Sequence, residues 1–95
     1  MSFNYEDNTG CLAYSKSGHD KGSLYVVIVM YENNVFLSDG RTRKVSSPKK
    51  KNLKHIQLIK NEKLYQEQLN DTDIKRAIKL YLARDSYSKD GKEAD

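Results

Sequence analysis

The 95-residue sequence is poor in cysteine and histidine, which limits the kinds of site it can form. It has one cysteine, Cys11, and two histidines, His19 and His55. A single cysteine cannot form an internal disulfide, and this composition fits a reducing compartment. The three residues also lack the paired spacing from which zinc sites are built, so we expect no metal and no other cofactor.

Long apolar runs are absent as well. The longest, residues 24–31, is far shorter than the roughly 20 residues that span a bilayer, and no charged-then-apolar segment opens the chain. We therefore expect a soluble, cytoplasmic protein that does not bind a membrane. A chain of this length supports one domain with a thin core. Because the sequence shows neither a nucleophile elbow nor an acid/base pair of carboxylates, we expect no enzymatic activity and no small-molecule substrate.

Acidic residues are missing from one stretch that is rich in basic ones. Residues 41–60 contain no Asp or Glu but eight basic side chains: Arg41, Arg43, Lys44, Lys49, Lys50, Lys51, Lys54 and Lys60. Such a run is either a solvated charged face or a binding surface for an anionic partner, and the lack of any acidic neighbour favours the partner. Nucleic acid is the commonest partner of this kind, because phosphate contacts supply much of the binding free energy in its complexes.

The order of apolar and turn residues predicts a barrel of short strands. The expected strands are residues 11–15, 24–31, 35–37, 41–45 and 55–59, and residues 46–52 are expected to form a loop. Asn33 and Asn34 tolerate the positive φ of a tight hairpin turn. So many short strands suit a small barrel closed on itself, because closure removes exposed strand edges.

The C-terminal third has the period of an amphipathic helix. Its apolar residues are Ile74, Ala77, Ile78, Tyr81 and Leu82, and Lys75, Arg76 and Lys79 lie on the opposite side. Asn70 or Asp71 can cap its start, and the basic side is either a solvated face or an additional RNA contact. We divide the chain into a flexible lead (residues 1–9), a barrel (10–60), a connection with the helix (61–85) and a disordered tail (86–95).

Three segments resemble the KOW motif and its continuation in short bacterial KOW-domain proteins. They are residues 10–27, with Gly22 at the position of the characteristic glycine, and residues 39–44 and 48–55. Those proteins are similar to a KOW-containing group of large-subunit ribosomal proteins of archaea and eukaryotes. The resemblance covers residues 10–59 and, more weakly, the helix. It implies a mainly β fold that binds RNA: a small five-stranded SH3-like barrel (KOW) with a C-terminal amphipathic α-helix.

The candidate RNA contacts lie in a glycine-bracketed loop and in the basic run. Gly18 and Gly22 permit positive φ and a close approach of the backbone to a phosphate, although two glycines can also merely turn a hairpin. Arg41 and Arg43, two apart on an expected strand, would bind phosphates from one face, and residues 49–51 would form a flexible finger. The full set of candidates is Lys16, Gly18, His19, Lys21, Gly22, Arg41, Arg43, Lys44, Lys49, Lys50, Lys51, Lys54 and His55.

We expect the protein to recognise folded RNA through its shape and phosphates. Base stacking by Tyr14, Tyr25, Tyr31 or Phe36 competes with a place for each ring in the core. The expected function is non-catalytic binding of large-subunit ribosomal RNA beside neighbouring ribosomal proteins. Two alternatives stay open: a KOW module of the transcription-elongation type, which binds RNA polymerase or nascent RNA, and an SH3-like module that binds proteins.

Overall fold

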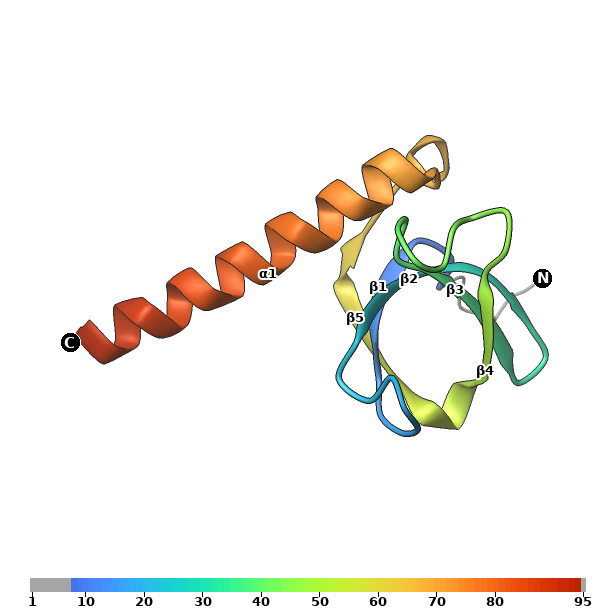
Figure 1. Cartoon of the computed structure of the whole chain (residues 1–95), viewed down its shortest axis with the longest axis horizontal. Helices are drawn as coiled ribbons and strands as arrows, with labels where there is room; N and C mark the ends of the chain where they lie inside the picture. The colour runs from blue at the N-terminus through green and yellow to red at the C-terminus, as the bar shows by residue number, and fades with distance from the viewer. Residues whose placement is uncertain (1–7, 95) are drawn as a thin grey trace.

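The computed structural model describes the backbone of residues 8–94 and the side chains of residues 8–59 and 62–84. A curled antiparallel sheet is followed by a long helix (Figure 1). The elements are β1 (Cys11–Ser15), β2 (Leu24–Tyr31), β3 (Asn34–Ser38), β4 (Lys49–Asn52), the 3-10 helix η1 (Leu53–His55), β5 (Ile56–Lys63), the 3-10 helix η2 (Gln66–Gln68) and α1 (Asp71–Ala94). The prediction of a mainly β, barrel-like fold with a C-terminal helix is confirmed.

The strands are adjacent in the order β4-β3-β2-β1-β5, and every pairing is antiparallel. β4 and β5 are the edges of this order, and η1 connects them directly. Figure 1 shows how strongly the sheet curls, so that the two edges lie on opposite sides of a barrel-like outline. In the described residues, the expected closure of the barrel is therefore not made by strand pairing between its edges.

Three strands lie where the sequence predicts them, and one is misplaced. β1, β2 and β3 cover the predicted segments, and β5 begins near the predicted position but continues to Lys63. Residues 41–45, an expected strand, form a loop, whereas the expected loop at residues 46–52 contains β4. Both predictions are wrong because β4 pairs with β3, while backbone N–H groups of residues 41–45 bond to carboxylates instead.

The β2–β3 hairpin turns one residue earlier than predicted. Tyr31 is paired with Asn34, which leaves Glu32 and Asn33 as the loop. The positive φ, 56°, falls on Glu32. The placement of positive φ on Asn33 and Asn34 is therefore wrong, because strand pairing already fixes Asn34 in an extended conformation.

Alternation along β2 divides the apolar residues between two clusters. The inner cluster comprises Ala13, Tyr25, Val27, Val35, Leu37 and Ile56, and the outer cluster comprises Leu12, Leu24, Val26 and Ile74. Successive side chains of a strand point to opposite faces, so Tyr25 and Val27 pack inside the curled sheet while Leu24 and Val26 pack outside it. Ile74 of α1 is fully buried in the outer cluster. The helix therefore docks on its own barrel.

The helix begins at a side-chain cap and runs past the barrel. Asn70 Oδ1 accepts a hydrogen bond from the N–H of Asp73 at 2.8 Å, which confirms the predicted cap. Ile78 and Tyr81 are half-buried against the outer cluster. The helical backbone continues through Ala94, beyond the predicted boundary at residue 85 and over the segment expected to be a disordered tail. Figure 1 shows its first turns against the sheet and the rest directed away from it.

Most of the predicted flexible lead, residues 1–7, lies outside the described residues. Over the part of the chain that the structure describes, no helix combines the length and apolar character that crossing a membrane requires.

Candidate nucleic-acid interface

The loop between β1 and β2, residues 16–23, presents several predicted contacts to solvent, and we call it the glycine loop. Its exposed candidates include Lys16, His19 and Lys21. Gly18 and Gly22 have φ values of 86° and 92°, so the predicted positive φ at both is confirmed. The loop is closed locally, because the N–H of Gly22 donates to the carbonyl of Ser15 at 2.8 Å.

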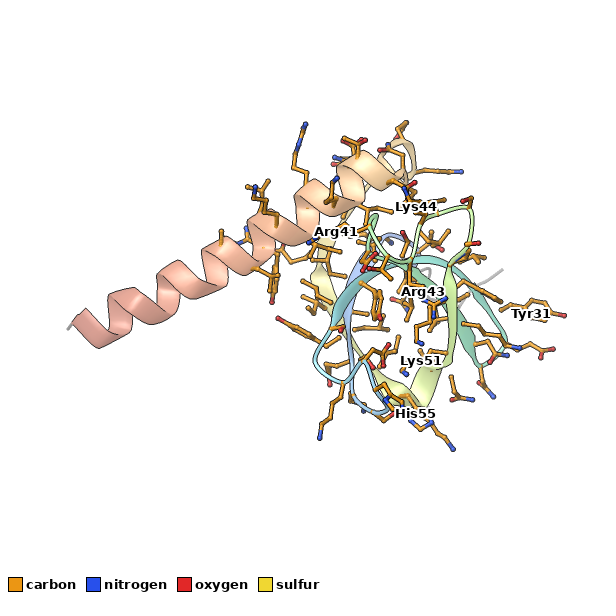
Figure 2. All side chains as sticks on the ribbon, viewed as in Figure 1. Tyr31, Arg41, Arg43, Lys44, Lys51 and His55 are labelled. Carbon is orange, nitrogen blue, oxygen red and sulfur yellow. The ribbon has the colours of Figure 1, made fainter. Side chains whose placement is uncertain are left out.

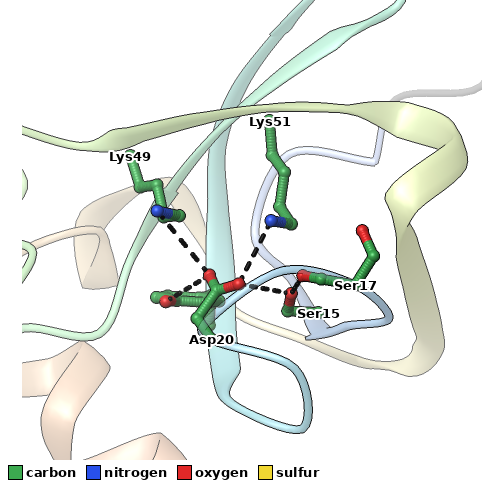
Figure 3. Close-up of polar contacts among 6 residues, drawn as sticks. Ser15, Ser17, Asp20, Lys49 and Lys51 are labelled. Carbon is green, nitrogen blue, oxygen red and sulfur yellow. Dashed lines mark hydrogen bonds and ion pairs between the residues drawn. The ribbon is translucent and has the colours of Figure 1, made fainter.

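Asp20 is the polar centre of this loop (Figure 3). The hydroxyls of Ser15 and Tyr25 each donate to its carboxylate at 2.8 Å, Lys51 Nζ donates at 3.1 Å, and Lys49 Nζ lies 3.9 Å away. Partial burial alone would raise the pKa of Asp20, but the hydrogen bonds from Ser15, Tyr25 and Lys51 outweigh it and lower the pKa from 3.8 to about 2. Burial, with the hydrogen bond to Asp20, raises the pKa of Tyr25 to about 12. We call these five residues the Asp20 cluster.

The Asp20 cluster changes the role of the β4 lysines. The side chains of Lys49 and Lys51 are 27% and 13% exposed and are directed to Asp20. The prediction that residues 49–51 form a flexible finger is therefore wrong, because they form a strand that is fastened to the glycine loop. Lys50 lies on the other side of the strand and is exposed. Sequence reasoning missed this anion because Asp20 lies 31 positions before Lys51.

The β3–β4 loop, residues 39–48, is held by two carboxylates. Its exposed basic residues are Arg41, Arg43 and Lys44. Asp39 Oδ1 accepts hydrogen bonds from the N–H groups of Arg41 and Arg43, each at 2.9 Å. The N–H of Val45 donates to Asp71 Oδ1 at 2.8 Å. The prediction that the two arginines share one face of a strand is wrong, and the loop is instead fastened to the start of α1.

A groove of about 940 Å³ lies between α1 and the barrel, and we call it the α1 groove. The barrel contributes Gly22, Ser23, Leu24, Asp39 and Arg41, and the helix contributes Thr72, Lys75, Arg76, Ile78, Lys79 and Leu82. Its four cationic residues, Arg41, Lys75, Arg76 and Lys79, are exposed. The sequence left the basic side of the helix open between a solvated face and an RNA contact. The sequence could not show that Arg41, on the β3–β4 loop, lines the same groove as the basic residues of the helix.

Other predicted contacts lie away from the α1 groove. Lys54 and His55 belong to η1, and the N–H of Lys16 donates to the carbonyl of His55 at 2.7 Å. Figure 2 shows His55 at the opposite end of the barrel from Arg41 and Lys44. The predicted residues therefore form no single patch. Gly22 and Arg41 line the α1 groove, Lys54 and His55 belong to η1, and Lys49 and Lys51 belong to the Asp20 cluster.

Among the described residues that line the α1 groove there is no aromatic side chain. Tyr25 is buried, Phe36 is half-buried, and Tyr14 packs edge-on against Tyr81 with 6.5 Å between ring centroids. Tyr31 is 66% exposed, but it lies on the side of the barrel away from α1 (Figure 2). Of the four aromatic residues considered for base stacking, only Tyr31 is largely exposed, and it lies outside the groove.

No protein-family model matches this chain, and a search of curated proteins found no match. The KOW assignment therefore remains a prediction from the sequence.

Proposed function

We propose that this protein is a non-catalytic RNA-binding module, an SH3-like barrel of the KOW type, that binds large-subunit ribosomal RNA in the cytoplasm beside neighbouring ribosomal proteins. The observation that carries the proposal is the surplus of exposed positive charge on the barrel. Residues 10–60 hold ten lysine and arginine residues against three acidic ones, Asp20, Glu32 and Asp39.

The acidic residues leave most of these cations without a protein anion. Asp20 pairs with Lys49 and Lys51, and Asp39 accepts hydrogen bonds from the backbone of its own loop. Within the described side chains, no ion pair involves the cations Lys16, Lys21, Arg41, Arg43, Lys44, Lys50 and Lys54. A surface of this kind favours a polyanion, whose phosphates replace the missing carboxylates.

The backbone of the glycine loop supports the KOW type. Gly22, at the position of the characteristic glycine in the resembling segment, has positive φ and is exposed. The curled five-stranded sheet is consistent with a small SH3-like barrel. Both observations agree with the fold that the resemblance implies.

The alternatives are a KOW module of the transcription-elongation type, which binds RNA polymerase or nascent RNA, and an SH3-like module that binds proteins. Val29 and Tyr31 on β2 are 46% and 66% exposed, and Tyr65 is 77% exposed. Exposed apolar and aromatic side chains of this kind suit a protein partner. They do not account for the unpaired cations, which is why we favour RNA.

Titration of a folded fragment of large-subunit ribosomal RNA at several salt concentrations tests the proposal. If about six phosphates are neutralised, the slope of log K against log [salt] is expected to be roughly −4 to −5. A slope near zero would remove the electrostatic mechanism. A DNA duplex serves as competitor, and equal binding of DNA would widen the proposal from RNA to nucleic acid in general.

Sedimentation of a cell extract through a sucrose gradient separates the ribosomal proposal from its alternatives. We expect the protein to migrate with large ribosomal subunits and to be released by high salt. Migration with RNA polymerase would favour the elongation module. Migration with another protein complex after nuclease treatment would favour the protein-binding module.

A further inference from the structure

We infer that the α1 groove holds the sugar-phosphate backbone of base-paired RNA, so that the helix is part of the RNA-binding surface. The inference rests on the proposed function and adds where the RNA lies and which part of it is contacted. It assigns a binding role to Lys75, Arg76 and Lys79, whose positions on an amphipathic helix are equally typical of a solvated face.

Both walls of the α1 groove are fixed before a ligand binds. Ile74 is fully buried under the helix, and the N–H of Val45 bonds to Asp71 across the junction. Gly40 lies against the backbone of α1, where a Cβ would collide with the carbonyl of Asp71 and lie 3.0 Å from the nitrogen of Lys75. Arg41 follows this contact directly. A groove whose walls need not move loses little conformational freedom on binding.

The charges of the groove suit a polyanion that lies along it. Lys75 and Lys79 are four positions apart and lie one helical turn from each other on the same side of α1. Arg41 adds a guanidinium from the barrel wall, so that positive side chains occur on both sides of the groove and outnumber its one carboxylate, Asp39. At Gly22 an added Cβ would have no atom within 4 Å, which leaves the protein backbone open to close approach there.

The chemistry of the lining favours the RNA backbone over the bases. Unpaired bases are usually recognised by stacking on aromatic rings and by hydrogen bonds to their edges. The lining residues include no aromatic ring and no side-chain amide, but they do include two hydroxyls, Ser23 and Thr72, beside the four cations. Lysine, arginine and hydroxyl groups are typical donors to phosphate and sugar oxygens. Base-paired RNA presents those oxygens while its bases are stacked inside.

The test compares two variants that each lose three positive charges. One is Lys75→Gln/Arg76→Gln/Lys79→Gln in the groove, and the matched control is Lys16→Gln/Lys50→Gln/Lys54→Gln outside it. Each is titrated with an RNA hairpin and with an unpaired strand of equal length. We expect the parent protein to bind the hairpin more tightly than the strand. The groove variant should lose at least about tenfold in hairpin affinity and two to three units of salt slope, and the control should lose only about one unit, that of Lys50.

The outcomes separate this inference from the proposed function. If the parent binds the hairpin but the groove variant loses no more than the control, the inference is overturned and the proposed function stands. Tighter binding of the unpaired strand also overturns it. If the parent binds neither RNA, the proposed function fails too.

A second measurement needs no variant and so does not depend on whether the substitutions are tolerated. Adding the hairpin to the parent protein should shift the NMR amide signals of Gly22, Thr72 and Lys79. Shifts confined to the residues around η1 would overturn the inference.

Discussion

The Asp20 cluster and the α1 groove use the same kinds of basic residue in opposite ways. In the cluster, Lys49 and Lys51 form ion pairs with the carboxylate of Asp20. In the groove, four cations share the lining with one carboxylate, Asp39, and one oxygen of that carboxylate is already bonded to two backbone N–H groups. Lys49, Lys51 and Arg41 all come from the acid-free run at residues 41–60, whereas the other groove cations come from α1. A run of positive charge therefore favours binding only where the fold does not supply the anion.

The two regions also differ in what builds them. The Asp20 cluster is a polar network that fastens the glycine loop to β4. The α1 groove exists because apolar packing of Ile74, together with the Val45–Asp71 hydrogen bond, holds the helix against the barrel. Mutations that damage one region should therefore leave the other intact, and the predictions for Ile74, Asp20 and the β4 lysines rely on this separation.

The largest effect is expected from breaking the groove at its apolar support. Ile74→Asp places an unpaired charge at a fully buried position and should reduce the free energy of unfolding by about 3–5 kcal/mol. Leu80→Asp is the control on the same helix, because Leu80 is 62% exposed and the change should cost little. Urea unfolding of both variants measures the difference. Equal stability of the two would show that α1 does not dock on the barrel in solution.

A smaller effect is expected from removing the anion of the Asp20 cluster. A pKa lowered from 3.8 to about 2 corresponds to about 2 kcal/mol, which solvent screening reduces, so Asp20→Asn should cost about 1–2 kcal/mol near pH 7. The pKa is lower in the folded protein, so this stabilisation is complete above a pH of about 4 and is lost as the pH falls toward 2. Unfolding at both pH values should show parent and variant converging in acid.

Glu67→Gln is the control for this pH series, because Glu67 is an exposed carboxylate outside the cluster. It should match the parent at both pH values. If Asp20→Asn were as stable as Glu67→Gln near pH 7, the cluster would contribute nothing to the fold.

Local sequence patterns predict β1, β2 and β3 but cannot predict β4. β1, β2 and β3 are rich in apolar residues and bounded by turn residues, so period and composition identify them. β4 is Lys-Lys-Lys-Asn and has no apolar residue. It is a strand because it pairs with β3 and because two of its lysines reach Asp20. Neither cause lies in its own sequence.

The same limit applies to the candidate site. The positive φ of Gly18 and Gly22 and the cap at Asn70 are local features, and the sequence predicts them correctly. The α1 groove brings together Arg41 and Lys75, which are far apart in the chain and meet only through tertiary contacts. A charge pattern identifies the residues available for binding but not the ones that share a surface.

Gly22 connects the two regions, because its N–H donates to the carbonyl of Ser15 in the Asp20 cluster and the residue also lines the α1 groove. Its φ of 92° disfavours a β-branched residue, and Gly22→Val should cost about 1 kcal/mol through backbone strain. Gly22→Asn is the control, because asparagine tolerates left-handed backbone better. We expect Val to reduce hairpin affinity more than Asn does, measured beside thermal melting. Parent-like hairpin binding by Gly22→Val would make Gly22 an ordinary turn residue and remove specific support for the KOW type.

The smallest and most direct comparison uses two adjacent residues of β4. Lys51 donates to Asp20 and is largely covered, whereas Lys50 is exposed and has no ion pair among the described side chains. Lys51→Ala should therefore cost about 0.5–1 kcal/mol of stability and leave the salt slope of RNA binding unchanged. Lys50→Ala should leave stability unchanged and reduce that slope by about one unit. Melting and salt titration of both variants give four values. If the two lysines behaved alike, the anion supplied by Asp20 would not distinguish structural from binding lysines.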